Sequence, residues 1–382
     1  MATTSLPEGA NLRQLRHQAK ELLCDCQAGG TTARERMAAI AQSPVESGAR
    51  LTLALAQRVL AHEYGFENWP QLKQQVEQTA TTTEAARMER LKEIGGQCKI
   101  DDLGRLQGVS LQGKQFGDAD VEHLTGLTRL RELYFTKTHI TDAGLGPLRS
   151  LTGLQRLSLT GRRVTGVGLQ QIAQLTHLQR LYLVKTGVDD GALAQLAGLT
   201  ELRELYLHHA VVTDAGLIHL AGLDQLSNVG FWGTRVEGRG LSRLPAPQRL
   251  RTLHLGHAAI TDAGLEVLQR FTQLELLCLY NTRVTDAGMR YLSAFADLRE
   301  LDLNKTAVTA AGIGQIAQCG QLQTLRLQIP DLTPEAIEQL GSLPQLRVLD
   351  LRASAVADRA VAELQQRLPG CKVQGPWQSP PA

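Results

Sequence analysis

One apolar pattern recurs along most of this chain at a constant interval. The pattern is L-x-x-L-x-L, with Val or Phe at some of its positions, and successive copies start 24 residues apart. A shorter last copy spans 368–373. A fixed period of this size predicts a solenoid, in which each repeat stacks on its neighbours and all repeats share one core. The eleven full copies start at Leu106, Leu130, Leu154, Leu178, Leu202, Leu226, Leu250, Leu274, Leu298, Leu322 and Leu346.

Each copy changes its periodicity halfway. The alternation within L-x-x-L-x-L predicts a short strand whose apolar residues face the core. The segment that follows, typically Thr-Asp-Ala-Gly-Leu as at 141–145, continues with apolar residues three or four apart, which predicts a helix. Its Thr or Asp is expected to cap the helix, and its glycine is expected to allow close packing in the first turn. Alternating strands and helices predict an α/β fold.

The repeat pattern also divides the chain into regions. Residues 89–374 are predicted to form the repeat domain with its caps, and residues 1–78, which do not follow the pattern, a small all-α bundle. We expect 79–88 to be a linker and the Pro-rich stretch 375–382 to be a disordered tail. Pro245 and Pro247 predict an irregular copy, because proline cannot continue a regular helix.

On these residues, the region from about 89 to 374 resembles leucine-rich-repeat proteins. It is similar to the subtype with Thr-Asp-Ala-Gly-Leu helix starts, found in bacterial repeat proteins and in ribonuclease-inhibitor-like and F-box-associated repeats. The asparagine that commonly follows the strand in this family is replaced, for example by Arg162, Ala210 and Ser354. The resemblance implies a leucine-rich-repeat solenoid with a curved parallel sheet on its concave face and helices on its convex face. It also implies that the chain binds another protein.

The bundle has a resemblance of its own. Residues 12–23 and 56–73 are similar to a short helical module that precedes ankyrin and other repeats in bacterial proteins. That likeness implies architecture and no particular activity. Apolar spacing predicts four helices in the bundle, with Gly29, Gly30 and Gly65 as helix stops and Asn68 as a cap.

Composition argues against several classes of partner and setting. The formal net charge of +2 gives no basic surplus for nucleic acid or an anionic membrane surface, and no stretch has the roughly 18 unbroken apolar residues of a membrane span. The first residues lack the apolar core of a secretory signal. The six scattered cysteines show no disulfide framework, which fits reduced thiols. We therefore expect a cytoplasmic, monomeric protein that binds neither nucleic acid nor membrane.

Candidate binding residues come from the strand positions that point away from the core. Only 4% of the residues are aromatic, yet several of them fall in the two strand columns on the concave face, with histidines among them. Exposed Tyr and Trp are enriched at binding hot spots, although rows of Tyr can also simply stabilise a sheet. We expect a partner-binding site formed by Tyr134, Tyr182, Tyr206, His208, Trp232, His254 and Tyr280.

The favoured function is therefore a non-enzymatic protein–protein interaction scaffold. One alternative is an adaptor, as in ubiquitin-ligase receptors or bacterial effectors, whose bundle recruits a second protein. Another is an enzyme that uses His254 and Cys278, but Cys278 lies between His254 and Asp302 in its column, the wrong order for a nucleophile–base–acid relay. A zinc site from His254, His257 and Cys278 is the remaining alternative. We expect no catalytic residues, no metal and no cofactor.

Overall fold

A computed structural model describes residues 12–41 and 51–375. The tail predicted from the sequence lies, apart from residue 375, outside this range. The chain divides into two compact units: an N-terminal unit, Met1–Glu93 with Asp102–Arg105, and the solenoid, Ile94–Asp101 with Leu106–Ala382. Within the described ranges no helix is both long and apolar enough to cross a membrane.

The N-terminal unit is helical. Two of its described helices, α1 (Leu12–Gln27) and α3 (Leu53–Glu63), each end two residues before a glycine with a left-handed backbone, Gly29 (φ 96°) and Gly65 (φ 82°), where glycine meets no steric penalty. Trp69 packs against the apolar core between the helices. Residues 79–88, predicted as a linker, are part of helix α4. The helices are α1 (Leu12–Gln27), α2 (Thr31–Ala41), α3 (Leu53–Glu63) and α4 (Trp69–Glu93).

The solenoid contains one sheet whose described strands follow one another in chain order. The first pair, β1 with β2, is antiparallel, and every later pair is parallel and in register with the 24-residue repeat. This confirms the predicted parallel sheet. The strands are β1 (Gln97–Ile100), β2 (Leu106–Gln112), β3 (Glu132–Thr136), β4 (Arg156–Thr160), β5 (Arg180–Val184), β6 (Glu204–Tyr206), β7 (Asn228–Gly230), β8 (Thr252–His254), β9 (Leu276–Cys278), β10 (Glu300–Leu303), β11 (Thr324–Leu327), β12 (Val348–Asp350) and β13 (Lys372–Gln374).

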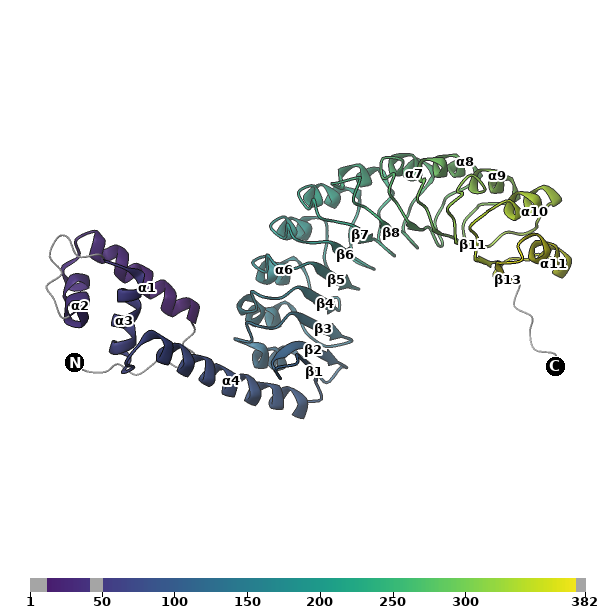
Figure 1. Cartoon of the computed structure of the whole chain (residues 1–382). Coiled ribbons are helices and arrows are strands. Elements are labelled where there is room, and N and C mark those ends of the chain that lie inside the picture. The colour runs from purple at the N-terminus through teal and green to yellow at the C-terminus, as the bar shows by residue number, and fades with distance from the viewer. Residues whose placement is uncertain (1–11, 42–50, 376–382) are drawn as a thin grey trace. The chain divides into compact units, whose positions relative to one another are not determined.

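Short helices return the chain along the outer side of the sheet, as Figure 1 shows for the solenoid. Many are 3-10 rather than α-helical. Leucines three apart, such as Leu145 and Leu148, share one face of a helix with three residues per turn, although the same spacing at Leu265 and Leu268 occurs in an α-helix. The α-helices are α5 (Asp118–Val121), α6 (Gly166–Ile172), α7 (Asp262–Leu268), α8 (Asp286–Met289), α9 (Ile313–Ile316), α10 (Pro334–Gly341) and α11 (Asp358–Arg367). The 3-10 helices are η1 (Glu122–Leu124), η2 (Asp142–Ser150), η3 (Gly191–Leu196), η4 (Asp214–Leu220), η5 (Arg239–Arg243), η6 (Arg290–Ala294) and η7 (Ala310–Gly312).

The prolines of the irregular copy follow η5, which has only five residues. Ala246, between the two prolines, has a left-handed backbone (φ 46°), a conformation that is uncommon for alanine. The irregularity is confined to the outer side of the solenoid, because the strands before and after it keep the parallel register, with Asn228 beside Thr252.

The helix starts hold neighbouring repeats together. Threonine caps its own helix as predicted: the Thr165 hydroxyl accepts a hydrogen bond from the Val167 N–H at 3.3 Å. The aspartate has a role between repeats that was not predicted from the sequence. The Asp142 carboxylate reaches the next repeat and accepts hydrogen bonds from the Thr165 N–H (2.7 Å) and hydroxyl (2.5 Å). The same arrangement recurs in the pairs Asp118–Thr141, Asp190–Thr213, Asp262–Thr285 and Asp286–Thr309.

This ladder of Asp–Thr hydrogen bonds between repeats explains why the Thr-Asp-Ala-Gly-Leu segment contains a glycine. A Cβ on Gly288 would collide with the Asp262 carboxylate of the preceding repeat, and the glycines that follow the other aspartates are equally confined. Where the preceding repeat has no aspartate, the glycine is not required: Ala192 follows Gly166 and Ala336 follows Ala310, each 26 residues later. The glycine therefore makes room for an inter-repeat carboxylate.

We predict a strong energetic coupling between Asp262 and Gly288. Gly288→Ala alone should lower the free energy of unfolding by about 1–3 kcal/mol, because the new methyl group displaces a half-buried, hydrogen-bonded carboxylate. The double variant Asp262→Gly/Gly288→Ala has the same two residue types that occur naturally at Gly166 and Ala192. Its free energy of unfolding should therefore be nearly equal to that of Asp262→Gly alone. Urea denaturation of the two single variants and the double variant measures this coupling; strictly additive costs would contradict the assignment.

Candidate binding face of the repeat sheet

Two tyrosines on adjacent strands stack on the inner face of the sheet. Tyr182 on β5 lies beside Tyr206 on β6 in the parallel register. Their ring centroids are 5.0 Å apart and the ring planes differ by 1°. Both side chains are half-buried. The strand spacing of about 4.8 Å sets this stacking distance, so the repeat itself fixes the pair.

Histidines extend this stack across the next strand. His208 meets the Tyr206 ring edge-on at 5.3 Å, and His254, two strands from Tyr206, lies 5.9 Å from it. This closeness across β7 depends on Gly230, which separates Tyr206 from His254 in the register. A Cβ on Gly230 would lie 2.5 Å from both Tyr206 and His208. We call Tyr182, Tyr206, His208 and His254 the first cluster.

A second cluster forms in the same way further along the sheet. Trp232 and Tyr280 lie two repeats apart, yet their rings stack with centroids at 5.5 Å and an interplanar angle of 14°. Gly256 occupies the position between them, where a side chain would collide with the Trp232 ring. His257 lies 5.1 Å from both rings, and the Lys305 ammonium lies 5.2 Å from the centre of the Tyr280 ring. Trp232, His257, Tyr280 and Lys305 make up the second cluster.

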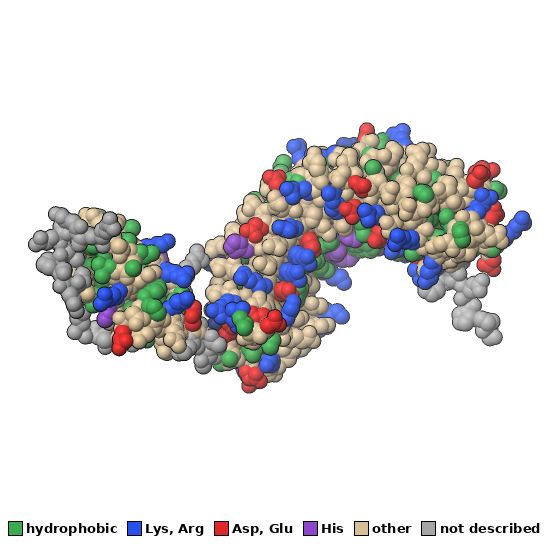
Figure 2. Space-filling view, in the orientation of Figure 1, with side chains coloured by type: hydrophobic (Ala, Val, Ile, Leu, Met, Phe, Trp, Pro, Cys, Tyr) green, Lys and Arg blue, Asp and Glu red, His purple; other side chains and the backbone are tan. Residues whose placement is uncertain are grey.

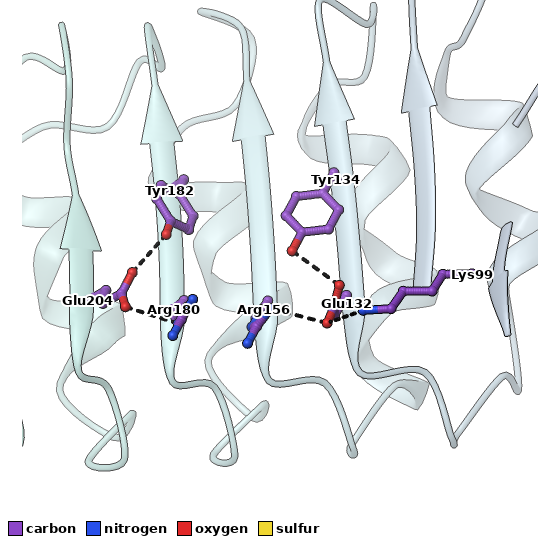
Figure 3. A network of polar contacts seen from close by, with 7 residues as sticks. All are labelled: Lys99, Glu132, Tyr134, Arg156, Arg180, Tyr182 and Glu204. Carbon is purple, nitrogen blue, oxygen red and sulfur yellow. Dashed lines mark hydrogen bonds and ion pairs between the residues drawn. The ribbon is translucent and has the colours of Figure 1, made fainter. Parts of the chain in front are cut away.

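Tyr134 is not part of either cluster. Ser158 lies next to Tyr134 in the register, and the Tyr134 hydroxyl donates a hydrogen bond of 3.4 Å to Glu132. Figure 3 shows that Glu132 also pairs with Lys99 (3.1 Å) and Arg156 (3.2 Å). The predicted site residues therefore separate: six of them pack into the two clusters, and Tyr134 belongs to a polar network.

The polar network has a second centre that touches the first cluster. Glu204 accepts a hydrogen bond from the Tyr182 hydroxyl at 2.8 Å and pairs with Arg180 at 3.0 Å (Figure 3). Burial, reinforced by this carboxylate, raises the pKa of Tyr182. The Tyr182 ring is thus held both by the Tyr206 stack and by its hydroxyl.

The family model described as a leucine-rich repeat region matches residues 105–378, which is well over half of the chain. The chain belongs to the leucine-rich-repeat family. Nothing matches it in a search of curated proteins.

Solved structures are also similar to this leucine-rich-repeat protein. An internalin (inlF) from Listeria monocytogenes is similar at 18% identity and a TM-score of 0.52, covering 78% of this chain and 95% of its own. An internalin C2 (inlC2) from Listeria monocytogenes has 23% identity and a TM-score of 0.37, covering 60% of this chain and 81% of its own. At these identities, the first likeness supports the fold alone.

The clustered histidines of the leucine-rich-repeat sheet are poorly placed to carry charge. Burial, with smaller contributions from His254 and His209, lowers the pKa of His208 to about 4. Burial also lowers the pKa of His254. The Nε2 atom of His208 is buried and, among the residues that the structure describes, has no hydrogen-bond partner. At neutral pH both rings are therefore uncharged, and the first cluster is an aromatic surface rather than a cationic one.

This burial predicts a pH dependence of stability. Because the pKa of His208 is about 4 in the folded protein and near 6.5 when unfolded, the unfolded chain binds more protons between these values. The stability contributed by neutral His208 is thus fully present above pH 6.5 and declines as the pH falls toward 4. We expect His208→Gln to reduce the loss of unfolding free energy between pH 7.5 and pH 5.0, measured by urea denaturation. An equal loss in both proteins would contradict this environment for His208.

The His254–Cys278–Asp302 column has the order expected from the sequence. Cys278 on β9 lies between His254 and Asp302 in the register. Burial raises the pKa of the Cys278 thiol to about 11, so it is protonated at neutral pH. Such a thiol is a weak nucleophile. Across the described ranges, no group of three or more His, Cys, Asp or Glu side chains is arranged to hold a metal ion.

Sequence reasoning missed several parts of this face. It identified the aromatic columns but not Gly230 and Gly256, which allow rings two strands apart to meet. It also assigned no role to Lys305 or to the carboxylates of Glu132 and Glu204. A signal was available for the glycines, because both stand in columns where the flanking repeats have large side chains.

Proposed function

We propose that this leucine-rich-repeat protein is a non-enzymatic scaffold that binds a protein partner with the two aromatic clusters on its concave face. The observation that supports this best is the pairing of scarce aromatic side chains into Tyr182–Tyr206 and Trp232–Tyr280 stacks on one face. Figure 2 shows histidine together with apolar and basic side chains on the inner side of the repeats. Tyr and Trp are the residue types that most often dominate binding energy.

The geometry favours recognition over a purely stabilising role for these rings. Stacking fixes their rotamers before any partner arrives, so little side-chain entropy is lost on binding. Gly230 and Gly256 are buried beneath the rings, so side chains two strands apart close over them into continuous aromatic clusters. Rings fixed in this way form a surface that is already in place before a partner binds.

The alternatives have less support. The high pKa of Cys278 argues against the enzyme that uses His254 and Cys278. The adaptor alternative, in which the N-terminal unit recruits a second protein, stays a prediction, as do the monomeric state, the bacterial origin and the helical-module resemblance. We further propose a reducing compartment such as the cytoplasm. Cys26, Cys278, Cys319 and Cys371 are buried, and none of these four forms a disulfide.

A capture experiment with the whole chain tests the scaffold. Three immobilised proteins are compared: the wild type, a Trp232→Ala/Tyr206→Ala variant and an Ile218→Ser control. Quantitative mass spectrometry identifies the proteins that bind to each. Ile218 lies on the outer helix η4 and is 47% exposed. We expect a partner retained by wild type and control and depleted on the double variant. Equal recovery from all three proteins would contradict binding at the clusters.

A further inference from the structure

The residues at and directly after the ends of strands β3 to β10 form an edge without acidic side chains. We call this edge the rim: residues 136–139, 160–163, 184–187, 208–211, 232–235, 256–259, 280–283 and 304–307. The whole chain has 38 acidic and 40 basic residues, so charges of both signs are equally common. The rim nevertheless has no Asp or Glu. Its Lys, Arg and His residues are Lys137, His139, Arg162, Arg163, Lys185, His208, His209, Arg235, His257, Arg283 and Lys305.

The cations of the rim are available to a partner. All seven of its Lys and Arg side chains are exposed, and none of them forms an ion pair with another described residue. The carboxylates on the concave face show the opposite behaviour, because Glu132, Glu204 and Glu275 each pair with an arginine. These three carboxylates are thus already neutralised by arginines, and the rim itself contributes only positive charge.

Backbone conformation gives an independent sign that the rim cations are retained for their side chains. Lys137, Lys185 and Lys305 occupy equivalent positions and have left-handed backbones, with φ of 55–56°. This conformation disfavours residues with a Cβ and suits Gly or Asn, which occur at the same position as Gly233 and Asn281. Lysine is therefore present at three positions where glycine would be locally more stable.

The rim also has a recess beside the clusters. Arg162, His209 and Arg235 line a hollow of about 320 Å³. His209 directly follows His208 of the first cluster, and the hollow also includes Gly233, which directly follows Trp232 of the second. Guanidinium groups bind carboxylates in a bidentate manner, so two arginines around one hollow suit an acidic side chain.

We propose that the rim binds an Asp/Glu-rich segment of the protein partner, alongside the aromatic clusters. This inference rests on the proposed scaffold function and specifies the partner's chemistry. A single-stranded nucleic acid suits the face less well, because bases need free ring faces and these rings stack on one another. A discrete acidic peptide needs only the exposed cations and the hollow.

The test uses the full chain and a fluorescent peptide of eight glutamates, with an eight-glutamine peptide and an eight-nucleotide oligothymidylate as comparison probes. The rim variant is Lys137→Gly/Lys185→Gly/Lys305→Gly, in which the left-handed backbone accepts glycine without strain. The control variant Arg149→Gln/Arg239→Gln/Arg243→Gln removes the same charge from exposed positions on the outer helices η2 and η5.

We expect the glutamate peptide to bind wild type and the control alike, to weaken about tenfold or more on the rim variant, and to weaken as salt increases. Equal weakening on both variants, no binding to wild type, or preferential binding of the oligothymidylate would overturn the proposal. Because the peptide contains no aromatic or apolar side chain, its binding reports on the cations of the rim rather than on the rings of the clusters. If the peptide test fails, the capture experiment with the Trp232→Ala/Tyr206→Ala variant still tests, separately, whether the aromatic clusters bind a protein partner.

Discussion

Leu205→Ala is expected to lower the free energy of unfolding by about 2–5 kcal/mol. Leu205 on β6 is fully buried and lies between Leu181 and Val229 of the adjacent repeats. Truncating it leaves a cavity that the flanking strands cannot fill, because their spacing is fixed by backbone hydrogen bonds on both sides. Urea denaturation followed by circular dichroism measures the change.

The matched control for this substitution is Ile218→Ala. It removes a similar apolar volume from a side chain that is 47% exposed on the outer side, so its cost should be much smaller. If Leu205→Ala lowered the free energy of unfolding by less than about 1 kcal/mol, the strand leucines would not form the core that neighbouring repeats share.

Trp232→Ala is expected to weaken partner binding by about 30-fold or more, since truncating a central Trp or Tyr commonly costs about 2 kcal/mol. Trp232 is half-buried between Tyr280 and His257, so the substitution removes contact area and also frees the two neighbouring rings. Tyr134→Ala, which lies outside both clusters, should weaken binding less than threefold. Isothermal titration calorimetry with the captured partner distinguishes these values.

If Tyr134→Ala weakened binding as much as Trp232→Ala, the polar network around Glu132 rather than the stacked rings would dominate the interface. A comparison of the unfolding free energies of both variants with wild type ensures that the measured loss reflects binding.

Much of the fold could be predicted from the sequence because each repeat faces the same demand for burial. The columns that begin with Leu106, Val109 and Leu111 are apolar in every copy, and a constant 24-residue step leaves one way to stack them. The helix type was harder to predict. Leucines three apart suit a 3-10 helix, while the general amphipathic pattern also suits an α-helix.

The Asp–Gly ladder was visible in the sequence but was interpreted locally. A capping aspartate and a small glycine were each assigned to their own helix, whereas the carboxylate of Asp262 bonds to Thr285 in the next repeat. The available signal was a correlation between repeats: Ala192 and Ala336 replace the glycine where Gly166 and Ala310 replace the preceding aspartate. Periodic sequences need to be compared across repeats as well as along them.

The binding face was predicted only in outline for a different reason. Columns show which side chains share a face, and they placed Tyr206, His208 and Trp232 together on the sheet. Which rings stack depends on rotamers and on empty neighbouring positions, and the column alone does not give these. Gly256 lets Trp232 reach Tyr280 across a full repeat, and Ser158 leaves Tyr134 apart from Tyr182.

Site-specific photo-crosslinking tests the concave binding face most directly. A benzophenone amino acid is introduced at Tyr206, within the first cluster, or at Ile218, on the outer helix of the same repeat. Each full-length protein is then irradiated with the captured partner. We predict a covalent complex from position 206 and none from position 218. A crosslink formed at position 218 and absent at position 206 would place the partner on the helices and contradict the proposed site.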